Sequence, residues 1–91
     1  MSLGLYFTPQ NFDKATYDEA LRRLEAAGAA SPAGRSYHDA MEMGGQLAVF
    51  DVWDSMAAFE EFGKTLLPIL TDLGVDPGQP MVAEVHNVVE G

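Results

Sequence analysis

The sequence predicts an α+β fold in which one antiparallel sheet carries two helices on the same face. Apolar and β-branched runs at 3–7, 35–53 and 81–89 are typical of strands. Two intervening segments place apolar residues at spacings of three and four, which is typical of helices. Because a glycine pair divides the middle run, the order is β-α-β-β-α-β. That order is characteristic of the ferredoxin-like arrangement.

The 91 residues are expected to form a single domain spanning 1–91. Residues 1–3 and 90–91 resemble remnants of an expression vector. The chain has no cysteine, which excludes disulfides and thiolate metal sites. No apolar run approaches the roughly 20 residues of a membrane span, and no signal peptide is visible, so we expect a cytoplasmic protein.

The charge balance is strongly acidic. Fourteen acidic residues against five basic ones give a net charge of −9. Nucleic acids and anionic membranes are bound through lysine and arginine, so neither is expected as a partner. The acidic residues are scattered along the chain, which is typical of a solvated surface.

The first strand, 3–7, is followed by the breaker "TPQN" and then by an amphipathic helix. Thr16 and Glu19 have the spacing of a capping box, so the helix is predicted to begin there. Gly28 suits its C-terminal end. The apolar face is predicted to comprise Tyr17, Ala20, Leu21, Leu24 and Ala27.

Gly44-Gly45 predicts a hairpin between strands 35–43 and 46–53, because a two-residue turn needs such residues. The resulting register sets His38 opposite Asp51, and Ser36 opposite Trp53. Opposed residues share a sheet face. One face is predicted to carry Ser36, His38, Ala40, Val49, Asp51 and Trp53, and the other Tyr37, Asp39, Met41, Ala48, Phe50 and Val52.

Asp54 or Ser55 is predicted to cap the second helix. Pro68 lies inside its apolar pattern and is expected to kink or restart the helix near 66–67. The last strand is predicted over 81–89. Since both sheet faces are apolar and the helices cover only one, a second copy of the chain is expected to cover the other, forming a homodimer.

The stretch "VFDVWDSMAAFEEF" resembles the signature V-x-x-W-x-S-x-x-x-F of the dimeric α+β barrel superfamily, which includes the antibiotic-biosynthesis-type monooxygenases. "LLPIL", "LGV" and "VHNVV" resemble an uncharacterised bacterial branch of it. The resemblance implies a ferredoxin-like fold that dimerises into a barrel. It also implies a ligand cleft between sheet and helices.

The resemblance stops short of two activities in that superfamily. Its haem-degrading members carry Asn on the first strand and Trp and His on the second helix, where this chain has Tyr6 or Thr8, Phe62 and Asp72. Its quinone-forming members carry Asn four residues before the strand Trp, where this chain has Val49. Haem degradation is not expected, and no cofactor is predicted.

His38 and Asp51 are the candidate catalytic residues. A carboxylate beside an imidazole orients the ring and raises its basicity, as a general base requires. The alternative is an ordinary cross-strand polar pair. Trp53, on the same face, is interpreted either as a wall of the ligand cleft or as a core residue.

Three further residues are candidate ligand contacts: Tyr6, Phe62 and His86. Each has a structural alternative, namely packing for the two aromatic residues and a satisfied structural histidine for His86. Two histidines and two carboxylates could bind a metal in principle. Their spacing matches no metal motif, so no metal site is predicted.

Three functions follow as hypotheses. The first is a homodimer that binds a small organic molecule in a sheet–helix cleft. The second is a cofactor-independent monooxygenase or isomerase acting on a small aromatic or polyketide-like substrate. The third is a non-catalytic structural or interaction module. A cleft containing His38, Asp51 and Trp53 separates the first two from the third.

Overall fold

The computed structural model describes residues 2–91. Its elements follow the predicted order of strands and helices. They are β1 (Leu3–Phe7), α1 (Lys14–Ala26), β2 (Arg35–Met43), β3 (Gln46–Trp53), α2 (Met56–Asp72) and β4 (Met81–Glu84).

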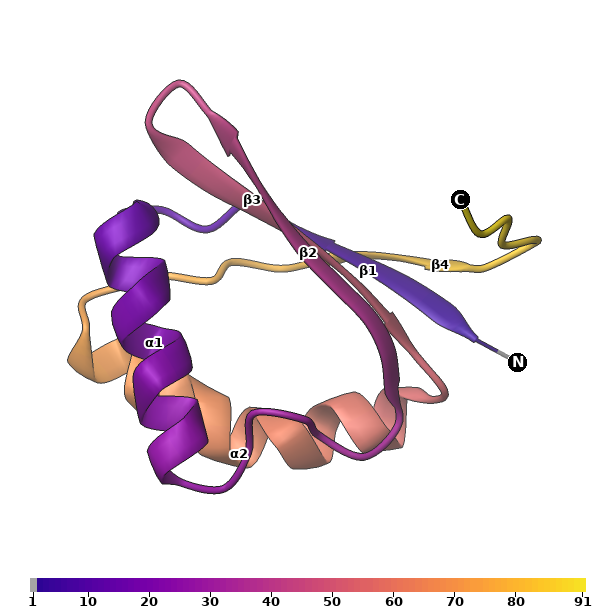
Figure 1. Cartoon of the computed structure of the whole chain (residues 1–91), viewed down its shortest axis with the longest axis horizontal. Coiled ribbons are helices and arrows are strands. Elements are labelled where there is room, and N and C mark those ends of the chain that lie inside the picture. Colours follow the sequence, from indigo (N-terminus) through magenta and orange to yellow (C-terminus); the bar gives the residue numbers. More distant parts are fainter. Residues whose placement is uncertain (1) are drawn as a thin grey trace.

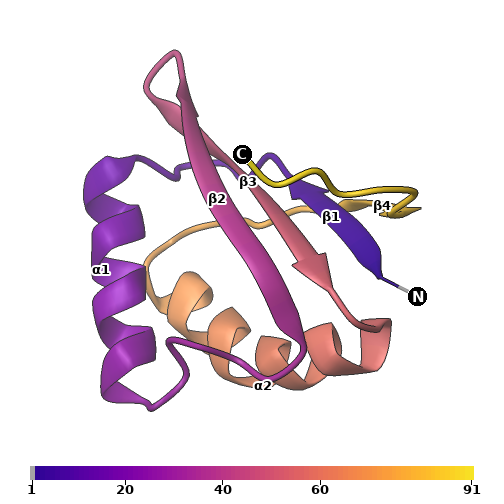
Figure 2. The same cartoon turned by 45° about the vertical axis from the view of Figure 1, so that its right-hand side comes forward.

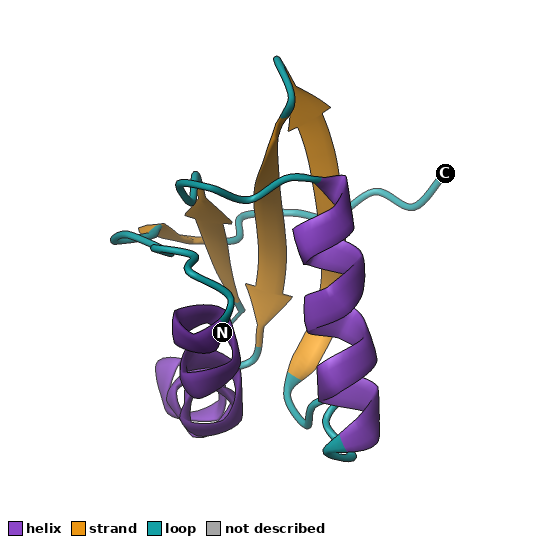
Figure 3. Ribbon diagram, turned by 90° about the vertical axis from the view of Figure 1, so that its left-hand side faces the viewer, coloured by secondary structure: helices purple, strands orange, loops and turns teal. Residues whose placement is uncertain are grey.

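The strands form one antiparallel sheet in the order β2-β3-β1-β4, and Figure 2 shows them side by side. Both helices pack on the same face of this sheet (Figures 1 and 3). The predicted ferredoxin-like α+β architecture is thus confirmed. A sheet covered on one face only leaves its other face without a layer of its own chain.

The hairpin between β2 and β3 turns at Gly44 and Gly45, whose φ angles of 62° and 85° suit a two-residue turn. His38 lies opposite Asp51, as predicted. The predicted pairing of Ser36 with Trp53 is wrong, because a bulge between Arg35 and Tyr37 sets Arg35 opposite Trp53. The extra residue that a bulge inserts accounts for this shift at the end of the strand.

Helix α1 begins earlier than the capping box predicted. Asp13 is its N-cap, and its carboxylate accepts a hydrogen bond from the Thr16 amide at 2.8 Å. Thr16 is therefore a residue of the first turn, because aspartate caps a helix at least as well as threonine does. Glu19 accepts hydrogen bonds from Arg22 and Arg23.

Helix α2 is capped by Ser55, whose hydroxyl accepts a hydrogen bond from the Ala58 amide at 3.1 Å. The helix runs without a break from Met56 to Asp72 with Pro68 inside it. Of the predicted kink or restart near 66–67, the restart is therefore wrong. Proline removes one helical hydrogen bond. The carbonyl that loses its donor is that of Lys64, and because this residue is exposed, water can satisfy it.

Strand β4 ends at Glu84, so the prediction of a strand over 81–89 is wrong. The cause is the length of its neighbour. Glu84 pairs with Leu3, the first residue of β1, and the Val85 amide donates to the Ser2 carbonyl at 2.9 Å. Beyond that point β1 offers no further backbone partner, and residues 85–91 form no strand.

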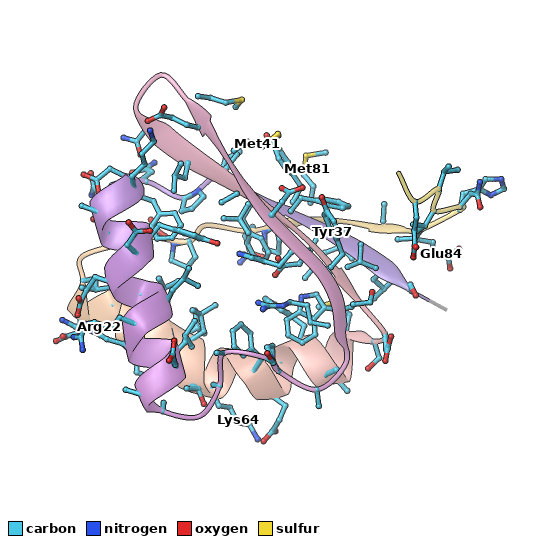
Figure 4. All side chains as sticks on the ribbon, in the orientation of Figure 1. Arg22, Tyr37, Met41, Lys64, Met81 and Glu84 are labelled. Carbon is cyan, nitrogen blue, oxygen red and sulfur yellow. The ribbon has the colours of Figure 1, made fainter. Side chains whose placement is uncertain are left out.

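The helix-covered face contains the core, in which Leu5 and Trp53 are fully buried. The other face is apolar but uncovered. Its side chains include Tyr37, Met41 and Met81, which are 52%, 51% and 72% exposed. In Figure 4 these three side chains lie on the side of the sheet away from the helices. We call this surface the open face.

Candidate functional site

A cavity of about 660 Å³ lies between the sheet and the two helices. Most of its wall is apolar, and this part includes Phe7, Phe12, Leu24, Phe59, Phe62 and Leu66. These side chains come from β1, α1, α2 and the segment before α1. The two helices and the sheet thus enclose the cavity from three sides.

One polar cluster interrupts the apolar wall. Tyr17, His38 and Asp51 all line the cavity, from α1, β2 and β3 respectively. The Tyr17 hydroxyl lies 2.6 Å from Nε2 of His38, and Nδ1 of His38 lies 2.5 Å from Oδ1 of Asp51. The cluster is a continuous hydrogen-bonded chain, which we call the Tyr–His–Asp chain.

Trp53 closes the inner end of this chain. Its Nε1 donates a hydrogen bond to Oδ2 of Asp51 at 3.2 Å. Asp51 is only 4% exposed, so its carboxylate needs such partners to compensate for lost hydration. The register explains why the two side chains meet, because residues two apart on a strand point to the same face.

Tyr17 holds the outer end. Its ring stacks on the His38 ring with centroids 5.9 Å apart and an angle of 6° between the planes. Burial raises the pKa of the Tyr17 hydroxyl above its ordinary value of 10.0, and the nearby Arg35 opposes that effect. The phenol therefore keeps its proton at neutral pH. A side chain held this way is positioned to exchange protons or hydrogen bonds with a molecule in the cavity.

The structure brings some predicted site residues together and separates others. His38, Asp51 and Phe62 line the cavity. Trp53 shares their face but is fully buried behind them, where it packs on Phe59 and Phe62. Tyr6 pairs with Phe50 on β3 and so belongs to the open face, opposite the cavity.

His86 is exposed in the segment after β4, outside the sheet. In residues 2–91, no group of three or more histidine, aspartate or glutamate side chains is arranged to hold a metal ion. No helix in this part of the chain is both long and apolar enough to span a membrane.

Sequence reasoning missed Tyr17 as a site residue and assigned it to the apolar face of the first helix. Ala20 and Leu24 of that face are buried and Tyr17 is half-buried, whereas Leu21 and Ala27 are exposed. The face carries the phenol to His38 on β2. The available signal was a hydroxyl on an otherwise apolar stripe, since a buried tyrosine hydroxyl usually finds a polar partner. The partner could not be identified without knowing which strand the helix crosses.

No protein-family profile and no curated protein sequence matches this chain. Solved structures do match its fold. SnoaB of Streptomyces nogalater, described as a cofactor-independent oxygenase, superposes with a TM-score of 0.62 at 19% identity, over 99% of this chain and 96% of SnoaB.

Two further structures give the same result. A Caulobacter crescentus protein, proposed to be an antibiotic biosynthesis monooxygenase, gives a TM-score of 0.63 at 16% identity, over 97% of this chain and 91% of that one. Rv0793 of Mycobacterium tuberculosis gives 0.55 at 18% identity, over 98% and 95%. The chain therefore has the fold of the antibiotic-biosynthesis-monooxygenase-like proteins, as the sequence resemblance predicted.

Proposed function

We propose that this protein binds a small, mostly apolar organic molecule in the cavity between sheet and helices. The observation that carries the proposal is the combination of an apolar hollow with a single hydrogen-bonded chain of polar groups. Ligand pockets typically measure about 300–1,000 Å³ and combine apolar walls with a few polar groups. The cavity's 660 Å³ and its lining match both features.

A thermal-shift screen with a panel of small aromatic compounds tests the proposal. Since a ligand that binds only the folded state stabilises it, a compound in excess should raise the melting temperature. The His38→Ala variant should fold and lose part of that shift, because the polar chain that positions Tyr17 is broken while the apolar wall remains. His86→Ala is the matched control and should keep it, because this histidine is exposed outside the sheet.

If His38→Ala kept the full ligand-induced shift, the Tyr–His–Asp chain would have no part in binding. If no compound shifted the wild-type protein either, a non-catalytic structural or interaction role would be favoured instead. The first outcome would contradict the proposed site, and the second would contradict the proposed binding function.

A second candidate function is that of a cofactor-independent oxygenase or an isomerase. The Tyr–His–Asp chain favours it, because an imidazole held by a buried carboxylate can accept the Tyr17 proton while the Tyr17 oxygen takes one from a bound substrate. Both reactions can begin with that step. The fold likeness to SnoaB, described as a cofactor-independent oxygenase, gives further support.

Two assays separate the second candidate from simple binding. An oxygenase consumes dioxygen when it is mixed with a phenolic compound from the panel. An isomerase exchanges carbon-bound hydrogen of its ligand for deuterium in D₂O. The His38→Ala variant should lose either activity, and a wild-type protein that binds without either reaction is a binding protein.

The assembly proposed with this function is a two-fold homodimer with the open faces packed together. Tyr37, Met41 and Met81 supply exposed apolar area on that face. A second copy of the chain would cover this apolar area.

A further inference from the structure

The direction of the hydrogen bonds in the Tyr–His–Asp chain can be followed from its inner end. Trp53 Nε1 can only donate, so Oδ2 of Asp51 accepts. Oδ1 of the same carboxylate lies 2.5 Å from Nδ1 of His38, and a carboxylate only accepts, so Nδ1 carries the hydrogen. In a neutral imidazole, Nε2 is then the acceptor.

The outer end follows from this tautomer. The only group that the structure places on Nε2 is the Tyr17 hydroxyl, at 2.6 Å. Because Nε2 accepts, the hydroxyl donates its hydrogen inward to His38. Burial keeps this phenol protonated, so the hydrogen is available at neutral pH. The oxygen of Tyr17 then presents only lone pairs to the cavity.

The other members of the chain have little to offer a ligand. Both ring nitrogens of His38 are engaged, and the Asp51 side chain is 6% exposed with a donor on each oxygen. Tyr17 is therefore the member whose polar atom still has a free hydrogen-bonding position toward the cavity.

The remaining polar side chains of the wall are Arg35, which offers only N–H donors, and three exposed residues. Arg35 donates to the Ala30 carbonyl at 3.2 Å, and its guanidinium carbon lies 5.7 Å from the centre of the Phe62 ring. The lining residues Glu60, Lys64 and Gln79 are exposed. Among the polar side chains of the wall that are not exposed, Tyr17 is the one that offers a free hydrogen-bond acceptor.

We infer that Tyr17 is the ligand-contacting residue of the cavity and that its oxygen accepts the hydrogen bond. The site would thus select apolar molecules that carry an O–H or N–H donor over the same molecules without one. This inference rests on the proposed binding function and specifies its ligand chemistry. It gives His38 and Asp51 the role of positioning residues, which hold the Tyr17 hydrogen turned away from the ligand.

The test compares three probes of nearly equal size by calorimetric titration at mildly alkaline pH. They are 2-naphthol, which has a donor, 2-methoxynaphthalene, which lacks it, and 2-acetylnaphthalene, which offers a strong acceptor. Wild-type protein should bind 2-naphthol about threefold to tenfold more tightly than 2-methoxynaphthalene, the range expected for one hydrogen bond. Tyr17→Phe should abolish that preference and leave the affinity for 2-methoxynaphthalene unchanged.

Tyr6→Phe is the matched control, because this tyrosine lies on the open face, and it should keep the wild-type preference. Equal wild-type affinity for the first two probes, or a preference that survives in Tyr17→Phe, would overturn the inference while leaving the binding function intact. A Tyr17-dependent preference for 2-acetylnaphthalene would show that the phenol donates, and would overturn it too. Binding of none of the probes would contradict the proposed function itself.

Discussion

Trp53 and Asp51, two residues apart on β3, are joined by a hydrogen bond of 3.2 Å from the indole nitrogen to the carboxylate. The indole is fully buried, and the carboxylate is 4% exposed. Trp53 therefore belongs both to the core and to the polar chain at the cavity. This dual role is why a tryptophan at the end of the strand shares its side with an aspartate.

Trp53→Phe should lower the free energy of unfolding by about 2 kcal/mol or more. The smaller ring leaves space in the core, and the buried carboxylate loses a donor. Urea unfolding followed by far-ultraviolet circular dichroism measures the change, since this variant lacks the only tryptophan. His86→Ala is the control, because this residue is exposed outside the sheet, and it should change stability by less than about 0.5 kcal/mol. Equal effects of the two variants would contradict the prediction.

Gly63→Ala should raise the free energy of unfolding by about 1 kcal/mol, because glycine is a poor helix former and this one lies within α2. A methyl group there meets no atom within 4 Å. The larger Gly63→Leu should reduce ligand binding, since position 63 lines the cavity. Urea unfolding and the thermal-shift assay measure the two effects.

Gly28→Ala is the control for that substitution. Gly28 has a φ of 74°, so a side chain should cost about 1 kcal/mol there although its surroundings are equally open. Stabilisation at both positions, or destabilisation at both, would contradict this account of the two glycines.

Glu19→Gln should lower the melting temperature at neutral pH, and the difference should disappear in acid. Hydrogen bonds from Arg22 and Arg23 lower the pKa of Glu19 from 4.5 to about 2. The unfolded chain regains the ordinary value, so the stabilisation is complete above pH 4.5 and is lost as the pH falls toward 2. Melting curves of both proteins across that range measure it.

Arg23, which donates to Glu19, also forms an ion pair with Asp72 of α2 at 2.6 Å. The interaction therefore connects the two helices that enclose the cavity. Glu25→Gln is the control, since this exposed carboxylate of α1 forms no ion pair within residues 2–91. A gap between Glu19→Gln and wild type that persists to the acid end would contradict the assigned cause.

Met41→Glu should convert the proposed dimer to a monomer. Facing carboxylates at a two-fold interface repel, and burying an unpaired charge is costly. Sedimentation velocity at micromolar concentration measures the state. Met56→Glu, which alters an exposed methionine at the start of α2, should leave the dimer unchanged. Wild-type protein that sediments as a monomer would rule out the assembly.

Much of this fold could be predicted from the sequence, because local patterns specify local structure. Gly44-Gly45 specified the turn, and the turn set His38 opposite Asp51. Two apolar faces on one hairpin predicted that both would need cover. The polar pair of the candidate site followed from the same register, since opposed residues on a strand pair must share a face.

Other features depended on contacts between distant segments. Strand β4 stops at Glu84 because β1 begins at Leu3, and the bulge at Ser36 displaces the pairing of Trp53. Tyr17 reaches His38 only because the tertiary packing brings α1 beside this part of the sheet. The sequence by itself therefore determined the order of the elements, the hairpin turn and the pair His38–Asp51. Only the tertiary structure decided where each strand ends and which helix brings its hydroxyl to the polar pair at the cavity. The reason is that local periodicity specifies which face of an element is buried but not which element covers that face.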